Sequence, residues 1–334
     1  MRAALAFEPV PYVPWAWGMT AECQRRLRAY LGRPNLSESE FVDSHFLHLP
    51  GGGERFVPAG AGRVRDRYGV VWDRTVDKDI GTPCAWPLQR PEDLEGYAWP
   101  DARDPAWYAG IAEARAARGD LVSFYALGFA LYERAWTLRG MDALLMDMVE
   151  RPTFVERLLD AIVEHDLLQV HRALELGVDG VAFGDDYGMQ RGLIFGIEHW
   201  RHFIRPRLAR LFAPVREAGR IVALHSCGCV TELLDDLVEI GLNLFNPFQP
   251  EVMDVPAVLR RYRGRLAFHG GMSVQRTLPF GDEAAVRAAT RSLIELGAGG
   301  GYVFAPSHAV PPDVPPENLV AMMDELRRQD GWGA

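Results

Sequence analysis

The feature that most constrains the fold is an alternation of short apolar runs with longer helical patterns, which begins at about residue 120. Small or polar residues follow each apolar run, and an amphipathic stretch comes before the next one. Strands that are apolar along their whole length and alternate with helices are typical of a parallel sheet covered by helices. The six predicted strands are 121–127, 180–183, 220–224, 242–245, 265–268 and 301–304.

Nearly every predicted strand ends in residues that carry hydrogen-bonding or ionisable groups. A closed barrel brings all such strand ends to one mouth, whereas an open sheet uses mainly the crevice at its switch point. We therefore predict an α/β fold with a single (β/α)8 TIM-type barrel, and keep the open doubly wound sheet as the alternative. The helices between the strands are predicted at 141–148, 153–176, 231–240, 284–296 and 316–329.

The first third of the chain has a weaker pattern that is rich in Pro, Gly and Trp. We predict a helix over 20–31, a β-hairpin over 63–75 and a flexible glycine loop at 51–53. One domain over residues 1–334 is expected. It has an irregular N-terminal extension with the first barrel elements in residues 1–115, and the core barrel repeats in residues 116–334.

Charge and composition exclude several classes of partner. The net charge is −9 and the arginines form no basic cluster, so neither nucleic acid nor an anionic membrane is expected as a partner. No apolar run approaches the roughly 18 residues of a spanning helix, and the N-terminus does not have the pattern of a secretory signal. Four cysteines in 334 residues do not make a disulfide framework, so we expect a cytoplasmic protein.

The sharpest local signal is the pair His225 and Cys227, with one residue between them. If the strand that precedes them continues to Cys227, both side chains point to the same face. An imidazole and a thiolate so placed can bind one Zn²⁺, which these donors suit better than Mg²⁺ or Ca²⁺. The structural alternative is a packed histidine beside a buried free cysteine.

A catalytic zinc site takes three protein ligands and leaves one position open. His308, which follows the last predicted strand, is placed to supply the third ligand. His269 and Cys229 are the alternatives, although Gly228 is expected to turn the chain away before Cys229. The predicted metal ligands are therefore His225, Cys227 and His308.

Polar residues at other strand ends are candidates for catalysis and substrate binding. Adjacent carboxylates cannot both point inward, so we expect one of Asp185 and Asp186 to face the cavity and the other to cap the next helix or to orient a neighbouring residue. Asp186 is the candidate for moving a proton, and both residues as turn or cap residues are the structural alternative. The predicted substrate-binding residues are Asp185, Tyr187, Gln190, Asn246, Gln249 and His269.

Several segments, spaced along the chain in order, resemble the uroporphyrinogen decarboxylase superfamily. These are LYERAWTLRGM at 131–141, FGDDYGMQ at 183–190, HSCG at 225–228, FNPFQP at 245–250, FHGG at 268–271 and PPENLVAM at 315–322. The resemblance implies a TIM-type barrel and a homodimer. It covers nearly all of the chain and is strongest from about residue 120 to 325.

The superfamily holds two chemistries, and the resemblance is closer to one of them. True decarboxylases act on a tetrapyrrole without a metal and carry an arginine-rich N-terminal signature, whereas this chain has PYVPWAW at 11–17. The other branch comprises methyltransferases in which a His-x-Cys pair and a later Cys hold zinc, and a corrinoid on a partner protein donates the methyl group. His225 and Cys227 match that pair. His308 stands where the later Cys is expected, and Ser273 where relatives often have Asp.

Three functions follow as hypotheses. The first is a zinc-dependent methyltransferase that moves a methyl group from a corrinoid or small donor to a thiol or other small acceptor, with Asp186, His225 and Cys227 as catalytic residues. The second is a metal-independent decarboxylase or lyase that acts on a small carboxylate. The third is a non-catalytic barrel that binds a corrinoid protein.

Overall fold

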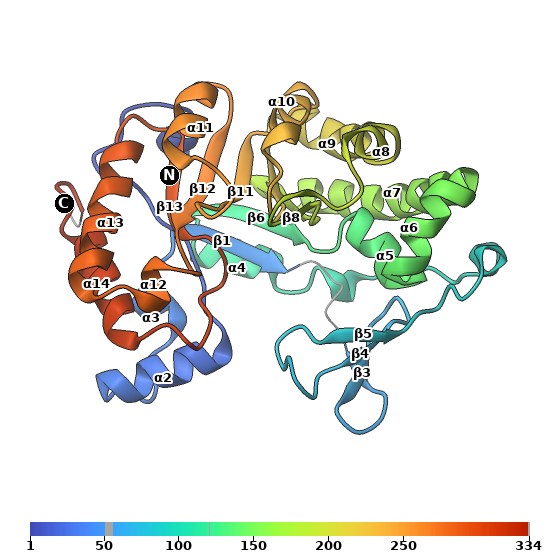
Figure 1. Ribbon diagram of the computed structural model, residues 1–334, viewed down its shortest axis with the longest axis horizontal. Coiled ribbons are helices and arrows are strands. Elements are labelled where there is room, and N and C mark those ends of the chain that lie inside the picture. Colours follow the sequence, from blue (N-terminus) through green and yellow to red (C-terminus); the bar gives the residue numbers. More distant parts are fainter. Residues whose placement is uncertain (51–55, 120, 333–334) are drawn as a thin grey trace. The chain divides into compact units, whose positions relative to one another are not determined.

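The apolar runs of the sequence form one seven-stranded sheet in a computed structural model of the chain (Figure 1). The structure describes residues 1–50, 56–119 and 121–332, so the glycine loop predicted at 51–53 lies outside the described residues. The strand order is β1-β6-β7-β10-β11-β12-β13, which follows the chain from first to last. The strands are β1 (Phe46–Pro50), β6 (Val122–Leu127), β7 (Gly180–Gly184), β10 (Ile221–His225), β11 (Leu244–Phe248), β12 (Ala267–Met272) and β13 (Tyr302–Pro306).

The α/β class is confirmed by the way these strands pair. β6 pairs with β7, β7 with β10, β11 with β12 and β12 with β13, all in parallel. Every residue of β13 is buried, and five of the six residues of β6 are buried. Burial on both faces is the reason that these strands are apolar throughout and show no alternation.

Two predicted strands are longer than expected at their C-terminal ends. We expected β11 to end at Phe245 and β12 to end at Phe268, but they continue to Phe248 and Met272. Asn246 and His269 therefore lie inside strands rather than after them. The pairing of β11 with β12 shifts register between Phe245 and Phe248, which accommodates the proline between them.

The described chain divides into two compact units. Unit 1 comprises Met1–Leu47, Cys227–Thr231 and Asn243–Ala334, and unit 2 comprises His48–Ser226 and Glu232–Leu242. The single domain expected over 1–334 stays a prediction. No helix in the described part of the chain is long and apolar enough to cross a membrane.

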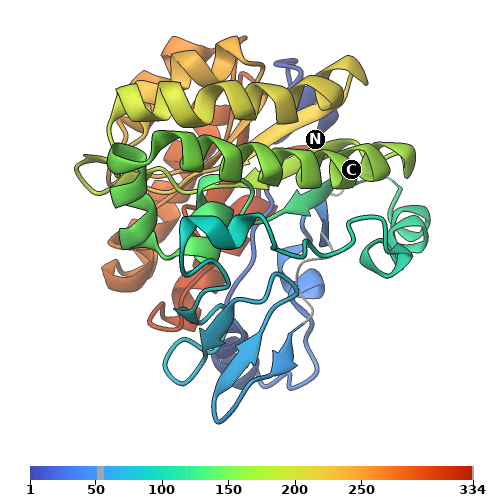
Figure 2. The same cartoon turned by 90° about the vertical axis from the view of Figure 1, so that its right-hand side faces the viewer.

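Unit 2 contains the longest helix and a small antiparallel sheet. α7 and α9 lie side by side (Figure 2) and are joined by an ion pair between Arg207 and Asp160 at 3.0 Å. The hairpin expected over 63–75 is β3 and β4 in a four-stranded antiparallel sheet. The helices are α4 (Ile111–Ala117), α5 (Tyr132–Arg139), α6 (Met141–Glu150), α7 (Pro152–Glu175), α8 (Ile197–His199), α9 (Arg205–Glu217) and α10 (Leu234–Glu239). The short strands are β2 (Val57–Pro58), β3 (Arg63–Arg65), β4 (Val71–Asp73), β5 (Thr82–Ala85), β8 (Gly188–Met189) and β9 (Gly192–Leu193).

Helices of unit 1 begin and end where the sequence places capping residues. The Thr20 hydroxyl accepts a hydrogen bond from Cys23 N at the start of α2, and Gly32 ends this helix at a φ of 63°. Asp282 caps α13 in the same way. The helices of this unit are α1 (Arg2–Leu5), α2 (Ala21–Leu31), α3 (Glu38–Val42), α11 (Val255–Tyr262), α12 (Thr277–Phe280), α13 (Glu283–Gly297) and α14 (Pro316–Arg327).

Residues 14–16 of unit 1 run beside β13 without forming a regular strand. Phe304 N donates to Pro14 O at 2.8 Å and Ala16 N donates to Phe304 O at 3.1 Å, so Trp15 forms a single parallel bridge with Phe304. His45, which precedes β1, donates its backbone N–H to Trp15 O at 3.0 Å. The segment thus has hydrogen bonds on both edges, but it is not an eighth strand by its pairing.

Candidate metal centre and its surroundings

The two predicted ligands in the His-x-Cys pair are held by the end of β10 and the loop that follows. His225 is the last residue of β10, so the strand does not continue to Cys227 as the alternation argument required. Gly228 has a φ of 86°, a backbone conformation that favours glycine, and it turns the chain directly after Cys227. Cys227 therefore lies in the loop beyond the strand, and strand alternation does not account for the position of its side chain beside His225.

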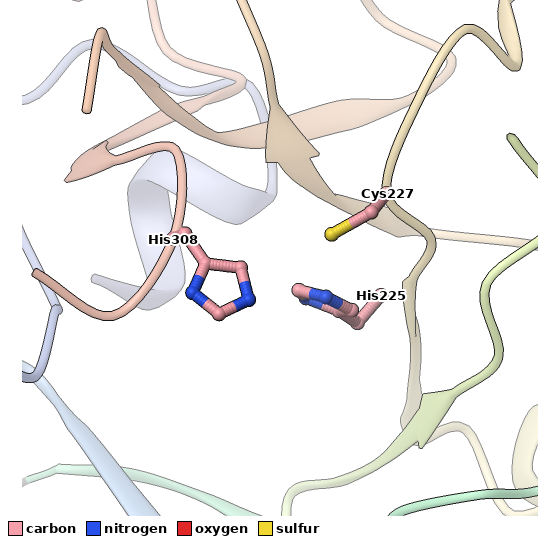
Figure 3. A group of neighbouring side chains, drawn as sticks. All are labelled: His225, Cys227 and His308. Carbon is pink, nitrogen blue, oxygen red and sulfur yellow. The ribbon is translucent and has the colours of Figure 1, made fainter. Parts of the chain in front are cut away.

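His225, Cys227 and His308 lie with their side chains pointing toward one another (Figure 3). One ligand atom from each residue can be chosen so that all three atoms lie within 4.8 Å of one another. Ligands of a tetrahedral zinc ion stand roughly 3.3–3.8 Å apart at ordinary bond lengths. The three donors would need only a small closing movement to share one ion. His225 and Cys227 are half-buried and His308 is exposed.

The two alternative third ligands lie outside this cluster in the described part of the chain. Asn246 Nδ2 lies 3.2 Å from His269 Nδ1 and donates to His269 O at 2.9 Å. On the other side of the ring, His269 Nε2 lies 2.5 Å from Ala16 O. Both ring nitrogens of His269 are thus in contact with protein atoms, and Asn246 acts as a partner for this histidine.

Gln249 supports the loop that carries Cys227. Its side-chain Oε1 accepts a hydrogen bond from Gly228 N at 3.1 Å, and only 6% of the residue is exposed. The substrate contact predicted for Gln249 stays a prediction, because the same amide still has its N–H groups. What the structure adds is a positioning role next to a candidate ligand.

Asp186 faces His225, as the expectation of one inward carboxylate requires. Asp186 Oδ1 lies 3.8 Å from His225 Nε2, too far for a direct hydrogen bond but close enough for electrostatic attraction to a charged imidazole. Both side chains are a little over one-third exposed. Asp186 is therefore reachable by a small molecule beside the candidate metal ligand.

Asp185 is the capping member of the pair, but it caps the preceding helix α5. Its two oxygens accept from Tyr132 N at 2.9 Å and Glu133 N at 2.6 Å, and Tyr187 Oη donates to it at 2.6 Å. Burial raises the pKa of Asp185 to about 7, although these three donors favour the charged form. Its side chain is fully buried, so the predicted substrate contact has no support in this geometry.

Tyr187 and Gln190 follow the carboxylates into a small hairpin. Tyr187 is buried, and its backbone N–H donates to Ser226 Oγ at 3.0 Å, which joins this segment to the residue between His225 and Cys227. Gln190 is exposed in the turn between β8 and β9. The substrate-binding roles given to these two residues stay predictions.

Glu133 is a site residue that sequence reasoning missed. Burial raises its pKa well above the usual range, and the nearby charges of Asp186 and Asp185 add to this effect. A carboxyl group with a raised pKa holds its proton to a higher pH than an ordinary glutamate, and such a group can act as a proton donor in a reaction. The available signal was its place in the first turn of α5, in the segment LYERAWTLRGM, where Asp and Glu are common for capping reasons alone.

Comparison with known proteins identifies the family of this chain. The family model described as uroporphyrinogen decarboxylase (URO-D) matches residues 80–329. The chain belongs to the URO-D family. The resemblance noticed in the sequence is therefore confirmed at the level of the family, and the matched region contains every residue of the candidate metal centre.

Curated URO-D relatives are distant in sequence. A protein from Methylococcus capsulatus named "Uroporphyrinogen decarboxylase" is 24% identical over 182 residues, which cover 54% of this chain and 50% of that protein. Proteins of the same name from Syntrophotalea carbinolica and Cupriavidus pinatubonensis are each 25% identical, over 57% and 74% of this chain and 53% and 71% of their own lengths. The chain spans about half the length of the first of these relatives.

A solved structure matches over nearly the whole chain. The structure described as a methyltransferase from Methanosarcina mazei has a TM-score of 0.72 and 20% sequence identity, and the match covers 97% of this chain and 96% of that one. At this identity the likeness shows a shared fold. The α/β architecture is therefore one that occurs among solved proteins of this length.

Proposed function

We propose that this URO-D family protein is a zinc-dependent methyltransferase that transfers a methyl group to a thiol or another small acceptor. The observation that carries the proposal is the convergence of His225, Cys227 and His308 within 4.8 Å. One thiolate and two imidazoles form a donor set that zinc accepts, and three protein ligands leave a position for a substrate. A zinc ion held there would bind the acceptor and lower the pKa of its thiol.

The surrounding residues support this chemistry. Asp186 Oδ1, which lies 3.8 Å from His225 Nε2, would take the proton that the acceptor releases. Gln249 would hold the Cys227 loop through Gly228 N, and Tyr187 N would hold Ser226. Because the third ligand is His308 and not Cys, the centre has one negative charge less than a Cys2His set, which makes a bound acceptor less nucleophilic.

The methyl donor is proposed to be a corrinoid carried by a partner protein, with a small-molecule donor as the alternative. A homodimer, which the family resemblance implies, and a cytoplasmic location, which the cysteine content of the sequence predicts, are part of the same proposal. We also propose that the sheet closes as an eight-stranded TIM-type barrel, with residues 14–16 in the eighth place. The hydrogen bonds of this segment to Phe304 and His45 support that closure.

The direct test combines metal analysis with a transfer assay. Protein purified without chelator is expected to contain about one zinc per chain, and to move the methyl group of methylcobalamin to 2-mercaptoethanol in the absence of oxygen. Cys227→Ala is expected to lose both the metal and the activity. The proposal is wrong if the purified protein has no stoichiometric zinc or if Cys227→Ala retains it fully.

A second candidate function is a metal-independent lyase that acts on a small carboxylate. The observation that favours it is the raised pKa of Glu133, which would let this residue protonate the carbon left by decarboxylation. This function predicts full activity in chelator and a strong dependence on Asp186 and Glu133. Carbon dioxide release from small carboxylic acids with and without chelator distinguishes the two functions.

A further inference from the structure

Unit 2 contains a cavity whose lining includes none of the three residues of the candidate metal centre. Its volume is about 220 Å³, and the residues at the end of β6, from Ala126 to Phe129, form one wall. The antiparallel sheet β2–β5 supplies the opposite wall with Tyr68 and Trp72. Typical cofactor pockets have at least about 300 Å³, whereas a cavity of roughly 150 Å³ holds a benzene ring. The size therefore suits a ligand with a single ring.

Aromatic side chains give this cavity its apolar surface. The rings of Trp72 and Phe129 meet edge to face at an interplanar angle of 64°, with centroids 5.4 Å apart, and both residues line the cavity together with Tyr68 and Phe56. Aromatic rings attract a further ring through offset or edge-to-face contacts, which add to the free energy gained by burying its area. A planar ring is thus favoured over an aliphatic group of equal size.

Arg134, on α5, brings a buried positive charge to the cavity wall. Only 6% of this residue is exposed, and its guanidinium carbon lies 3.6 Å from the ring centroid of Tyr68. Among the described residues it has a 3.5 Å hydrogen bond to Thr137 Oγ1 and a 3.8 Å ion pair with Asp66. These contacts are long, and a guanidinium has five N–H donors arranged for bidentate binding of a carboxylate.

The two acidic residues that line the cavity are Asp66 and Asp79, and in the described chain only Asp66 forms an ion pair with Arg134, at 3.8 Å. Asp66 accepts from Val70 N and from Trp72 Nε1, each at 2.9 Å, which uses both of its oxygens. Asp79 is exposed. Guanidinium groups cover two of the aromatic rings. Arg134 lies over the ring of Tyr68, and the guanidinium carbon of Arg74 lies 4.1 Å from the ring centroid of Phe56. Because guanidinium groups already occupy these faces, the cavity complements an anion better than a quaternary ammonium ion.

We propose that this cavity binds a small aromatic carboxylate, whose ring lies among Tyr68, Trp72 and Phe129 and whose carboxylate pairs with Arg134. The site contains no candidate metal ligand, so the proposal does not depend on the methyl-transfer function. Binding in metal-free protein would be unchanged from binding in zinc-loaded protein. Failure of one proposal is therefore distinguishable from failure of the other.

The test is a fluorine NMR titration of the full chain with 4-fluorobenzoate. We expect saturable binding that unlabelled benzoate displaces, and binding of the neutral 4-fluorobenzamide that is weaker by roughly tenfold or more, because it lacks the charge-assisted pair. Arg134→Gln is expected to weaken 4-fluorobenzoate and to leave 4-fluorobenzamide unchanged. This selectivity is a result that a merely structural role of Arg134 would not produce.

A cavity-filling variant covers the case in which Arg134→Gln fails to fold. Gly128 lines the cavity, and a Cβ added there meets no heavy atom within 4 Å. Gly128→Leu should fill the space and abolish binding without disturbing the backbone. Gly96→Ala is the matched control, since Gly96 also has open space but lies outside the cavity lining. The proposal is overturned if Gly128→Leu binds 4-fluorobenzoate as the wild type does, or if trimethylphenylammonium binds more tightly than benzoate.

Discussion

Gln249 Oε1 accepts a hydrogen bond from the backbone N–H of Gly228 at 3.1 Å, directly after the candidate ligand Cys227. The amide comes from the segment that follows β11, and the loop it holds follows β10. Gly228 turns the chain with a φ of 86°, and this bond holds the backbone of that turn directly after Cys227. Gln249 thus acts on the candidate site through the backbone.

The first prediction concerns this bond. Gln249→Leu should lower the affinity for zinc by roughly 10- to 100-fold, the usual effect of removing a residue that orients a metal ligand. Competition against a chromophoric chelator measures the affinity. Gln249→Glu keeps a hydrogen-bond acceptor for Gly228 N and should therefore keep most of the wild-type affinity for zinc. Equal zinc affinity in Gln249→Leu and the wild type would contradict the positioning role.

The second prediction separates the two cysteines of the loop. Cys227→Ser and His308→Ala should each lower the zinc content measured by elemental mass spectrometry, because their side chains belong to the three-residue cluster. Cys229→Ser is the control, since Cys229 lies outside this cluster in the described chain, and its zinc content should match the wild type. Loss of zinc from Cys229→Ser alone would assign the third ligand differently.

The third prediction uses the raised pKa of Asp185, which burial brings to about 7. The folded protein holds this proton more tightly than the unfolded chain, whose aspartates titrate near 3.9. The stability from this group is therefore complete below about pH 4 and is lost as the pH rises to about 7. The loss is on the order of 1 kcal/mol per pH unit across that window.

Urea unfolding at pH 5, 6 and 8 measures how steeply the free energy of unfolding falls as the pH rises. Asp185→Asn should flatten it, and the exposed Asp330→Asn should leave it as in the wild type. Part of the slope should remain in Asp185→Asn, because the pKa of Glu133 is raised as well and acts in the same direction. An unchanged slope in Asp185→Asn would show that Asp185 is charged in the folded protein at all three pH values.

The fourth prediction concerns Cys23, which is 2% exposed on α2. Burial raises the pKa of its thiol to about 11, so almost none of it is thiolate at pH 8. Peptide mapping after treatment with iodoacetamide should show Cys23 reacting about 100-fold more slowly than the partly exposed Cys84. In urea the two cysteines should react at similar rates. Equal rates in the native protein would contradict the burial of Cys23.

Much of the fold was accessible from the sequence because its signals are local. α7 spans Pro152–Glu175, within one residue of the predicted helix at each end, and α2 ends at the predicted Gly32. The strand positions were correct because apolar runs buried on both faces differ plainly from amphipathic helices. Strand ends were less accurate. β12 continues through His269 to Met272, since its pairing with β13 and not its own composition determines its length.

The same difference between local and distant signals decides which residues of the candidate site could be predicted. The pair His225 and Cys227 was visible because the two residues are neighbours in the chain, and Asp186 was visible because it follows a strand. Of the partners from distant segments, His308 was predicted from its place after a strand, whereas the backbone groups that Asp185 caps were not. Asp185 caps α5 through Tyr132 N and Glu133 N, contacts that span more than 50 residues of chain. No local sequence pattern predicts such a contact.

The sequence by itself determined the family, the α/β class and the candidate pair of His225 and Cys227, because these depend on residue types and on short spacings. Only the tertiary structure shows that ligand atoms of His308, His225 and Cys227 lie within 4.8 Å of one another, while His269 contacts Asn246 and Ala16. It also decided that Arg134 lines a cavity beside Tyr68. The physical reason is that the convergence of side chains depends on how strands and loops pack in three dimensions. The local sequence of a segment does not show which distant segments it contacts after folding.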